Sequence, residues 1–155
     1  MTLPGGVGGG LLGVLLLACS DPAGPSLSDE PRLVLQIIPG SNWNNLPNDQ
    51  ATITAARIAG STLHLTVQYG GGCNSHRFAL VAGTSFGESL PLYTMLRLAH
   101  DGSRDPCDAL ITRQLEVDLS PIVPLVQQAG GSALRFDVVE PDGRVSSVGE
   151  LLLTF

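Results

Sequence analysis

The sequence predicts an all-β fold: an antiparallel β-sandwich, Ig-like or of a related type, with one short connecting helix. Apolar and polar residues alternate with a period of two in several segments, as strands with one buried face require. Gly, Pro, Asp and Asn gather between these segments, where turns are needed. The chain has 155 residues, which suits one domain with a core of its own.

The first strand candidate is the short apolar run 33–38. Residues 39–50 follow as a predicted loop, with Trp43 among Asn and Pro. We expect Trp43 to cover one end of the core, and an exposed platform for a ligand is the alternative.

A hairpin comes next, in which residues 52–59 lead through Gly60 and Ser61 into the alternating run 62–69. The remaining strand candidates share this alternation and are residues 78–80, 96–98, 115–119, 134–138 and 151–155. Only residues 120–128 look helical, with Ser120 as the expected N-cap and Pro121 at the first helical position.

The N-terminal apolar run, residues 7–18, is too short to span a bilayer, which takes about 20 residues. It ends in Leu16-Leu17-Ala18-Cys19, a small-residue ending that suits signal-peptide processing. This tetrapeptide resembles the lipobox of bacterial lipoproteins, in which the cysteine receives a diacylglycerol and becomes the first residue after cleavage. The resemblance implies a signal peptide over 1–18 and lipidation at Cys19.

One feature departs from that pattern, because residues 1–6 carry no Lys or Arg, whereas signal peptides usually begin with positive charge. The alternative for this segment is an apolar helix of a soluble protein. The glycines at 5, 6, 8, 9, 10 and 13 disfavour such a helix.

The resulting organisation is a signal peptide over 1–18, a lipidated flexible tether over 19–31 and a single β-sandwich domain over 32–155. The tether assignment follows from its Ser, Asp, Pro and Gly content. The expected location is the bacterial cell envelope. Ser20 directly after the cysteine resembles lipoproteins sent to the outer membrane, if the cell has one, where the domain would face the periplasm or the cell surface.

The charge of the chain bears on its partners. The formal net charge is −6, and the eight basic residues are all Arg and form no cluster. We expect no nucleic-acid partner, because phosphate binding needs basic residues gathered on one face. The membrane, reached through the lipid on Cys19, is the one expected partner, and a protein or glycan ligand stays open.

Three cysteines leave an even pair, Cys73 and Cys107, once Cys19 is lipidated. We therefore expect a disulfide, since the envelope is oxidising. These cysteines belong to the pattern YxGGCxxHxFxL followed by HDxxxDxC, within residues 69–118. The pattern resembles uncharacterised bacterial secreted proteins and lipoproteins, and the resemblance implies family membership without an activity.

The same pattern supports metal hypotheses. Cys73, His76, His100 and Cys107 are the ligand types of a structural zinc site, but a disulfide would remove both thiolates. A smaller alternative is a metal site of His76 and His100 with Asp101 or Asp105, beside the disulfide. The simplest interpretation has both histidines hydrogen bonded to loop carbonyls or carboxylates. We expect no cofactor.

Two further segments match a known motif only in part. Asp101, Ser103 and Asp105 match the start of a calcium loop, but Pro106 replaces the turn glycine and Thr112 replaces the closing Glu. The second is Gly83-Thr84-Ser85-Phe86-Gly87, which has the form of a nucleophile motif, but Pro91 interrupts any helix that follows.

Two functions follow from these observations. The favoured one is a non-catalytic binding or structural module of the envelope, because the sequence assembles no acid, base and nucleophile. The alternative is a metal-binding protein or metal-dependent enzyme centred on His76 and His100. Enzymatic activity is left open, with the balance against it.

Overall fold

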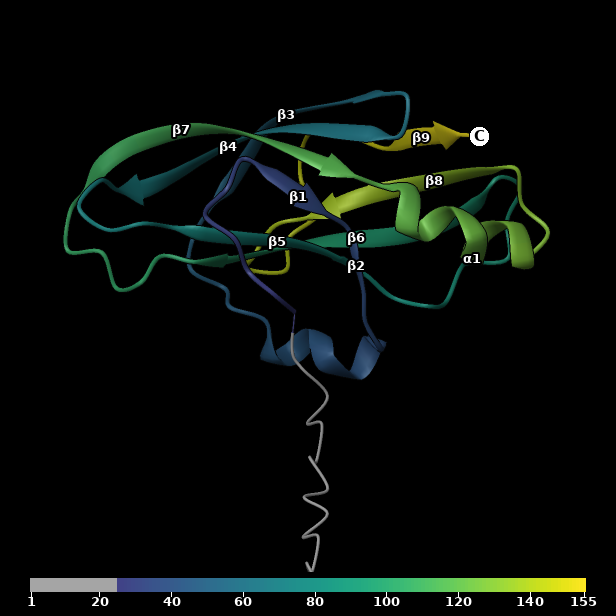
Figure 1. Ribbon diagram of the computed structural model, residues 1–155, viewed down its shortest axis with the longest axis horizontal. Helices are drawn as coiled ribbons and strands as arrows, with labels where there is room; N and C mark the ends of the chain where they lie inside the picture. Colours follow the sequence, from purple (N-terminus) through teal and green to yellow (C-terminus); the bar gives the residue numbers. More distant parts are fainter. Residues whose placement is uncertain (1–24) are drawn as a thin grey trace, which may run out of the picture.

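The structure is a computed structural model that describes residues 25–155. In this part of the chain, nine strands form two sheets that pack face to face, and one short α-helix lies at one end (Figure 1). The expected all-β fold with one short connecting helix is confirmed. The expected signal peptide, 1–18, and Cys19 lie outside the described residues.

The first sheet has four strands in the order β1-β7-β4-β3. Their bounds are β1 (Arg32–Val34), β3 (Thr52–Ala59), β4 (Thr62–Gly71) and β7 (Ala109–Asp118). The second sheet has five strands in the order β2-β5-β6-β8-β9. Their bounds are β2 (Gln36–Ile37), β5 (Arg77–Ala82), β6 (Leu92–Asp101), β8 (Ala133–Val139) and β9 (Leu151–Thr154).

Both sheets are mixed, which corrects the expectation of purely antiparallel sheets. The pairs β1/β7, β2/β5 and β6/β8 run parallel. Parallel neighbours need a long connection, and here each connection passes through the other sheet. Alternation of apolar and polar residues reports which face of a strand is buried, and it does not report strand direction.

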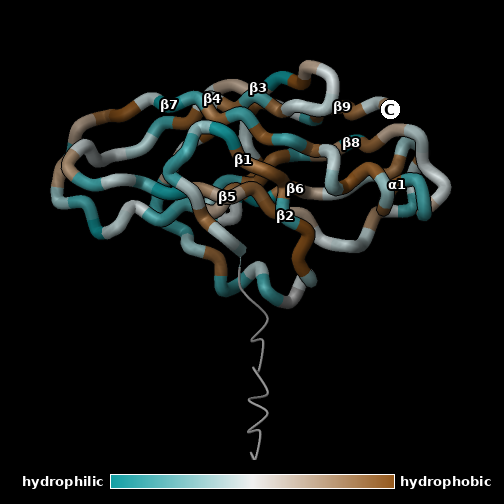
Figure 2. Tube along the Cα trace, viewed as in Figure 1, coloured by the Kyte–Doolittle hydropathy of each residue, from teal (hydrophilic) through white to brown (hydrophobic). Residues whose placement is uncertain are grey.

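The core lies between the two sheets. Along β4 the buried residues Leu63, Leu65, Val67 and Tyr69 alternate with more exposed polar ones, as the sequence predicts. The apolar stretches follow the strands, and hydrophilic stretches lie at the loops (Figure 2). Burial of each such aliphatic side chain contributes about 1.5–3 kcal/mol, so this interface dominates the stability of the fold.

A second, smaller apolar cluster covers the outer face of β5. Ala79 and Val81 of that strand are buried there by Ile38, Leu46 and half-buried Trp43. Trp43 lies in the 3-10 helix η1 (Gly40–Asn45), below the second sheet in Figure 1. Trp43 therefore packs on the outside of a sheet and is not an open platform.

The connecting helix occupies the predicted residues but begins differently. Ser120–Ile122 form a 3-10 turn, η2, which continues into α1 (Val123–Gln128). Asp118 caps this turn, because its carboxylate accepts hydrogen bonds from the Ser120 N–H and the Ser120 hydroxyl, both at 2.9 Å. The expected N-cap, Ser120, is thus the capped residue, because a carboxylate two residues earlier forms an Asx turn.

Residues 25–31, the described part of the expected tether, are bonded to the domain. Ser28 exchanges two backbone hydrogen bonds with Phe78, at 2.8 and 2.7 Å. Pro31 accepts a hydrogen bond from the Glu116 N–H at 2.7 Å. Ser26 also bonds to the Gln36 side chain of β2: its N–H donates to Oε1 at 2.7 Å, and its carbonyl accepts from Nε2 at 2.5 Å. The chain thus joins the domain from Ser26 onwards.

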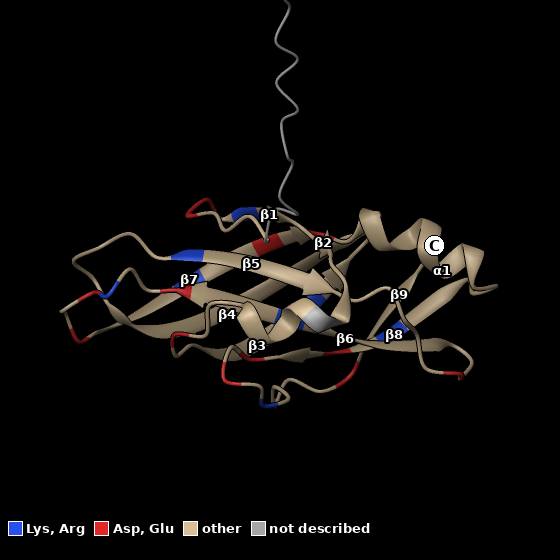
Figure 3. Ribbon diagram, turned by 90° about the horizontal axis from the view of Figure 1, so that it is seen from below, with Lys and Arg blue, Asp and Glu red and all other residues tan. Residues whose placement is uncertain are grey.

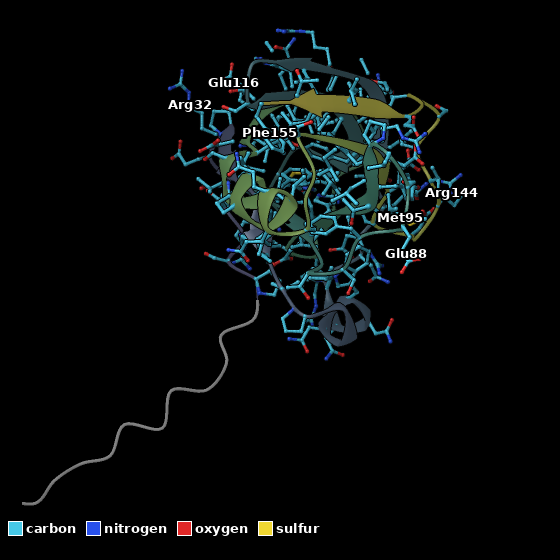
Figure 4. The ribbon with its side chains drawn as sticks, turned by 90° about the vertical axis from the view of Figure 1, so that its right-hand side faces the viewer. Arg32, Glu88, Met95, Glu116, Arg144 and Phe155 are labelled. Atoms are coloured by element: carbon cyan, nitrogen blue, oxygen red, sulfur yellow. A yellow bond between two sulfur atoms is a disulfide. The ribbon has the colours of Figure 1, made fainter. Side chains whose placement is uncertain are left out.

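Charged residues are scattered over the loops and outer faces (Figure 3). Arg32 and Glu116 form one ion pair at 3.3 Å, on the side of the molecule away from Arg144 and Glu88 (Figure 4). Within residues 25–155, the one α-helix is far too short to cross a membrane.

Candidate functional site

The candidate site lies where the β4–β5 and β6–β7 loops meet. Cys73 of the first loop and Cys107 of the second form a disulfide, with Cα atoms 5.8 Å apart. His76 of the first loop, His100 of β6 and Asp105 of the second loop lie beside this bond. Most of the sequence pattern therefore forms one spatial cluster, although the two bridged cysteines are 34 residues apart.

Asp105 is the centre of the cluster. Its Oδ2 atom accepts hydrogen bonds from the N–H groups of Gly72, Cys73 and Asn74, at 2.9, 2.9 and 2.8 Å. Its Oδ1 atom accepts one from the Cys107 N–H at 2.9 Å. Consecutive backbone N–H groups that converge on one point form an anion-binding nest. The Asn74 N–H foremost, with the other amides, holds the pKa of the Asp105 carboxyl far below its usual range.

Glycine at position 71 makes room for this arrangement. A Cβ atom on Gly71 would lie 2.4 Å from His76 Nε2 and 3.0 Å from Asp105 Oδ2. The neighbouring Gly72 has φ +119°, which residues with side chains rarely adopt. The glycines of the pattern thus bring the backbone against the cluster.

His76 and His100 continue the cluster inwards as a hydrogen-bonded chain. His76 Nε2 lies 3.1 Å from Asp105 Oδ2, and His76 Nδ1 lies 2.9 Å from His100 Nε2. His100 Nδ1 lies 3.0 Å from the carbonyl oxygen of Asp49. Both histidines are buried, at 4% and 1% exposure, so these partners take the place of water.

The proton count of this chain follows from its ends. The Asp49 carbonyl and the Asp105 carboxylate only accept hydrogen bonds, so each must face an N–H group. The contact between the two rings needs one further N–H, on either His76 Nδ1 or His100 Nε2.

Burial acts on the inner histidine. Desolvation is the largest cause that lowers the pKa of His100 below its usual value of 6.5. Burial therefore favours the neutral imidazole at His100, which donates from Nδ1 to the Asp49 carbonyl.

Aromatic rings enclose both histidines. Tyr69 stacks on His76 with ring centroids 4.5 Å apart, and Phe78 lies nearly parallel to His100 at the same separation. Arg113 lies 5.6 Å above the Phe78 ring and donates a hydrogen bond to the His76 carbonyl at 3.2 Å. The alternation of β4 and β5 places these rings in the core next to the loops.

Asp101 lies apart from the cluster, although the sequence groups it with Asp105. Its carboxylate pairs with Arg77 and accepts the Ser103 N–H at 2.8 Å. The Ser103 N–H, and then Arg77, lower the pKa of the Asp101 carboxyl. Asp101 and Asp105 therefore face different partners, which leaves the calcium-loop resemblance without a shared centre.

The two histidines and Asp105 do not converge on one point either. His76 uses one ring nitrogen for Asp105 and the other for His100. Among residues 25–155, the one set of three possible metal-binding groups within 4.8 Å of one another is Cys73, Asp105 and Cys107. The metal hypothesis at His76, His100, Asp101 and Asp105 stays a prediction.

An open cleft of about 240 Å³ borders the cluster, lined in part by both histidines, Asp105, Cys107 and Asp49. Sequence reasoning missed Asp49, whose carboxylate also accepts the Gly102 N–H at 2.7 Å. Asp49 lies in a loop without periodicity, and it acts on His100 through its backbone, so its side-chain type gave no signal.

Ser85 and His64 lie away from this cluster. Ser85 lies in the loop between β5 and β6, two adjacent antiparallel strands, and no helix follows it as a nucleophile turn would require. His64 lies on the outer face of the first sheet, 3.8 Å from Glu116. Neither residue belongs to the cluster.

The comparisons with known proteins identify a shared fold. No family model and no curated protein sequence matches the chain. Among solved structures, a Bacteroides vulgatus protein of unknown function, DUF1344, has a TM-score of 0.54 at 13% identity over 81% of this chain and 57% of its own. A NigD-like immunity protein of Bacteroides caccae has a TM-score of 0.51 at 18% identity over 76% of this chain and 58% of its own.

A third structure is a Bacteroides fragilis protein that is provisionally named a lipoprotein. It has a TM-score of 0.53 at 13% identity and covers 80% of this chain and 71% of its own. This chain spans less than two thirds of the first two neighbours. At these identities the likeness establishes the fold alone: the described part of the chain has the two-sheet β fold of these Bacteroides proteins.

Proposed function

We propose that this chain is a lipid-anchored protein of the bacterial cell envelope, and that its β-sandwich is a non-catalytic binding or structural module. The anchor is Cys19, at the end of the lipobox-like residues 16–19. A fold neighbour that is provisionally named a lipoprotein supports the anchor. So does the disulfide Cys73–Cys107, because disulfides persist in oxidising compartments.

The observation that carries the non-catalytic part is the closed hydrogen-bond chain from Asp49 through His100 and His76 to Asp105. Acid, base or nucleophilic catalysis needs a group that can turn to a substrate. Here the four ring nitrogens of the two histidines and Asp105 Oδ2 all have partners inside the fold. The cluster therefore serves to join the two loops under the disulfide.

The ligand class is left as in the sequence analysis, a protein or a glycan. One fold neighbour is named a NigD-like immunity protein, and a Parabacteroides distasonis neighbour is provisionally named toxin-related. Those names belong to proteins that share only the fold with this chain, so they assign it no ligand.

Fatty-acid labelling tests the anchor. Cells that express the full chain with an alkyne fatty acid in the medium should yield labelled protein in the membrane fraction. The variant Cys19→Ser should lose the label, while Cys73→Ser should keep it. Absence of label in the unaltered protein, or label that survives Cys19→Ser, would overturn the proposal.

Metal analysis of the oxidised protein separates the module from the metal-dependent alternative at His76 and His100. We expect no free thiols and no stoichiometric metal. A bound metal that is lost in His100→Gln while the disulfide stays intact would favour the alternative.

A further inference from the structure

We propose that Cys73, Cys107 and Asp105 form a zinc-binding site when the disulfide is reduced, so that this end of the domain has two exclusive states. The Sγ atoms of the two cysteines and one carboxylate oxygen of Asp105 lie within 4.8 Å of one another. This inference goes beyond the proposed function, which concerns the oxidised, lipid-anchored chain.

Asp105 keeps the two cysteines together without help from the sulfur–sulfur bond. Its Oδ2 accepts the Cys73 N–H and its Oδ1 accepts the Cys107 N–H, both at 2.9 Å. The Gly72 and Asn74 N–H groups add two more hydrogen bonds from the first loop to the same carboxylate. These four hydrogen bonds connect the first loop to the second loop through Asp105. The two thiols therefore stay adjacent after reduction.

The donor set suits zinc. Two thiolates and a carboxylate are common zinc ligands, and three protein ligands leave a fourth position for water. Soft thiolates also favour zinc over magnesium or calcium. His76 lies behind Asp105 and donates to its Oδ2 at 3.1 Å, as partners of metal ligands often do.

The bridged cysteines are reachable from solvent. Cys73 is exposed and Cys107 is half-buried, whereas the Asp105 side chain is only 2% exposed. Cys107 and Asp105 also line the open cleft of about 240 Å³. A reductant can thus reach the bond, and a metal ion can reach the sulfurs that it leaves.

The chemistry balances with a dithiol reductant. The reductant gives up two electrons and two protons and becomes a disulfide, while Cys73 and Cys107 each gain one electron and one proton. Zinc then replaces the two thiol protons, which pass to solvent. The metal and the disulfide exclude each other because both use the same sulfurs.

Zinc and cobalt titration of the purified full chain tests the proposal. After reduction with a phosphine, which does not compete for the metal as a thiol would, we expect one zinc ion per chain. Cobalt should give thiolate-to-metal charge-transfer absorption. The oxidised chain should bind neither metal at this site.

Matched variants define the ligands. Asp105→Asn should weaken zinc binding at least about tenfold, since loss of even a residue that only supports a ligand costs 10–100-fold. Asp101→Asn, at the end of β6 and paired with Arg77, should leave zinc affinity unchanged. Should Asp105→Asn fail to fold, Cys73→Ser keeps Asp105 and should bind zinc no better than the oxidised chain.

The proposal is overturned if the reduced chain binds zinc no more tightly than Cys73→Ser. It is also overturned if folded Asp105→Asn binds zinc as the unaltered chain does, because the thiols alone would then account for binding. Fatty-acid labelling does not depend on either result, so failure here leaves the proposed anchor untouched.

Discussion

Asp105 bonds to the backbone of both bridged cysteines, and one side chain therefore orders two loops. Its role differs from that of a surface acid such as Asp142, which pairs with the exposed Arg144. Carboxylates that accept several N–H groups are much harder to replace than those in exposed ion pairs.

Replacement of Asp105 by Asn should therefore cause a large drop in Tm. The amide keeps one oxygen but turns an NH2 group towards N–H donors, and it removes the negative charge opposite His76. Thermal unfolding followed by circular dichroism should show a much larger loss than for Asp101→Asn. Equal losses would contradict the role assigned to Asp105.

The lowered pKa of His100 predicts that the folded protein loses stability at acidic pH. Its pKa is lowered in the folded protein, so below its usual value of 6.5 the unfolded chain binds a proton that folded His100 does not. Stability should fall from about pH 6.5 towards the lowered pKa, by at most about 1.4 kcal/mol per pH unit. Urea unfolding between about pH 6.5 and pH 5 measures this, above the range where carboxyl groups titrate.

The matched variants for this measurement are His100→Gln and His64→Gln. The first should flatten the dependence on pH, and the second, on the outer face of the sheet, should retain it. A steep acid loss that persists in His100→Gln would assign the effect to another group.

At the scale of elements, β7 has a buried half and an exposed half. Leu115 is fully buried, whereas Leu110 on the same strand is 72% exposed. Leu115→Ala should cost about 2–5 kcal/mol of unfolding free energy because it leaves a cavity. Leu110→Ala should change it by no more than about 0.5 kcal/mol. Urea unfolding of both variants checks this difference.

The start of the connecting helix gives a second prediction. Asp118→Ala should cost about 0.5–2 kcal/mol, because the Ser120 N–H loses its carboxylate. Ser120→Ala should cost less, since the backbone bond remains. If Ser120→Ala were the more damaging change, Ser120 would be the cap that the sequence predicts.

The elements also show what can be predicted from sequence. The alternation in 62–69 and 134–138 predicted β4 and β8 and their buried faces correctly. Pairing direction could not be predicted, since β6 and β8 have the same alternation whether parallel or antiparallel. Asp118 was missed as a cap because it also continues the alternation of β7.

At the scale of the molecule, the disulfide closes a loop between residues 34 positions apart. The double variant Cys73→Ser/Cys107→Ser should lose about 3–4 kcal/mol of unfolding free energy, because its unfolded chain is less restricted. Urea unfolding of the oxidised protein and this variant measures the difference. An unchanged free energy would mean that the crosslink hardly restricts the unfolded chain.

The residues of the site could be predicted from the sequence, but the hydrogen bonds between them could not. Cysteine parity predicted the bridge that the structure contains, and the pattern brought His76, His100 and Asp105 into consideration. Their order in the chain of hydrogen bonds depends on loop geometry, including the close approach of Gly71. The hydrogen-bond chain ends at the Asp49 carbonyl. This carbonyl belongs to the backbone, so the residue type at position 49 could not have predicted its role.

The hydrogen bonds of Ser26 to Gln36 have a consequence for where the protein can work. If Cys19 holds the lipid, as proposed, the tether between Cys19 and Ser26 spans at most about 25 Å. A domain on so short a tether can reach only a thin layer next to the membrane rather than the whole compartment. Its effective concentration is then high for partners in or near the same membrane and close to zero for distant ones.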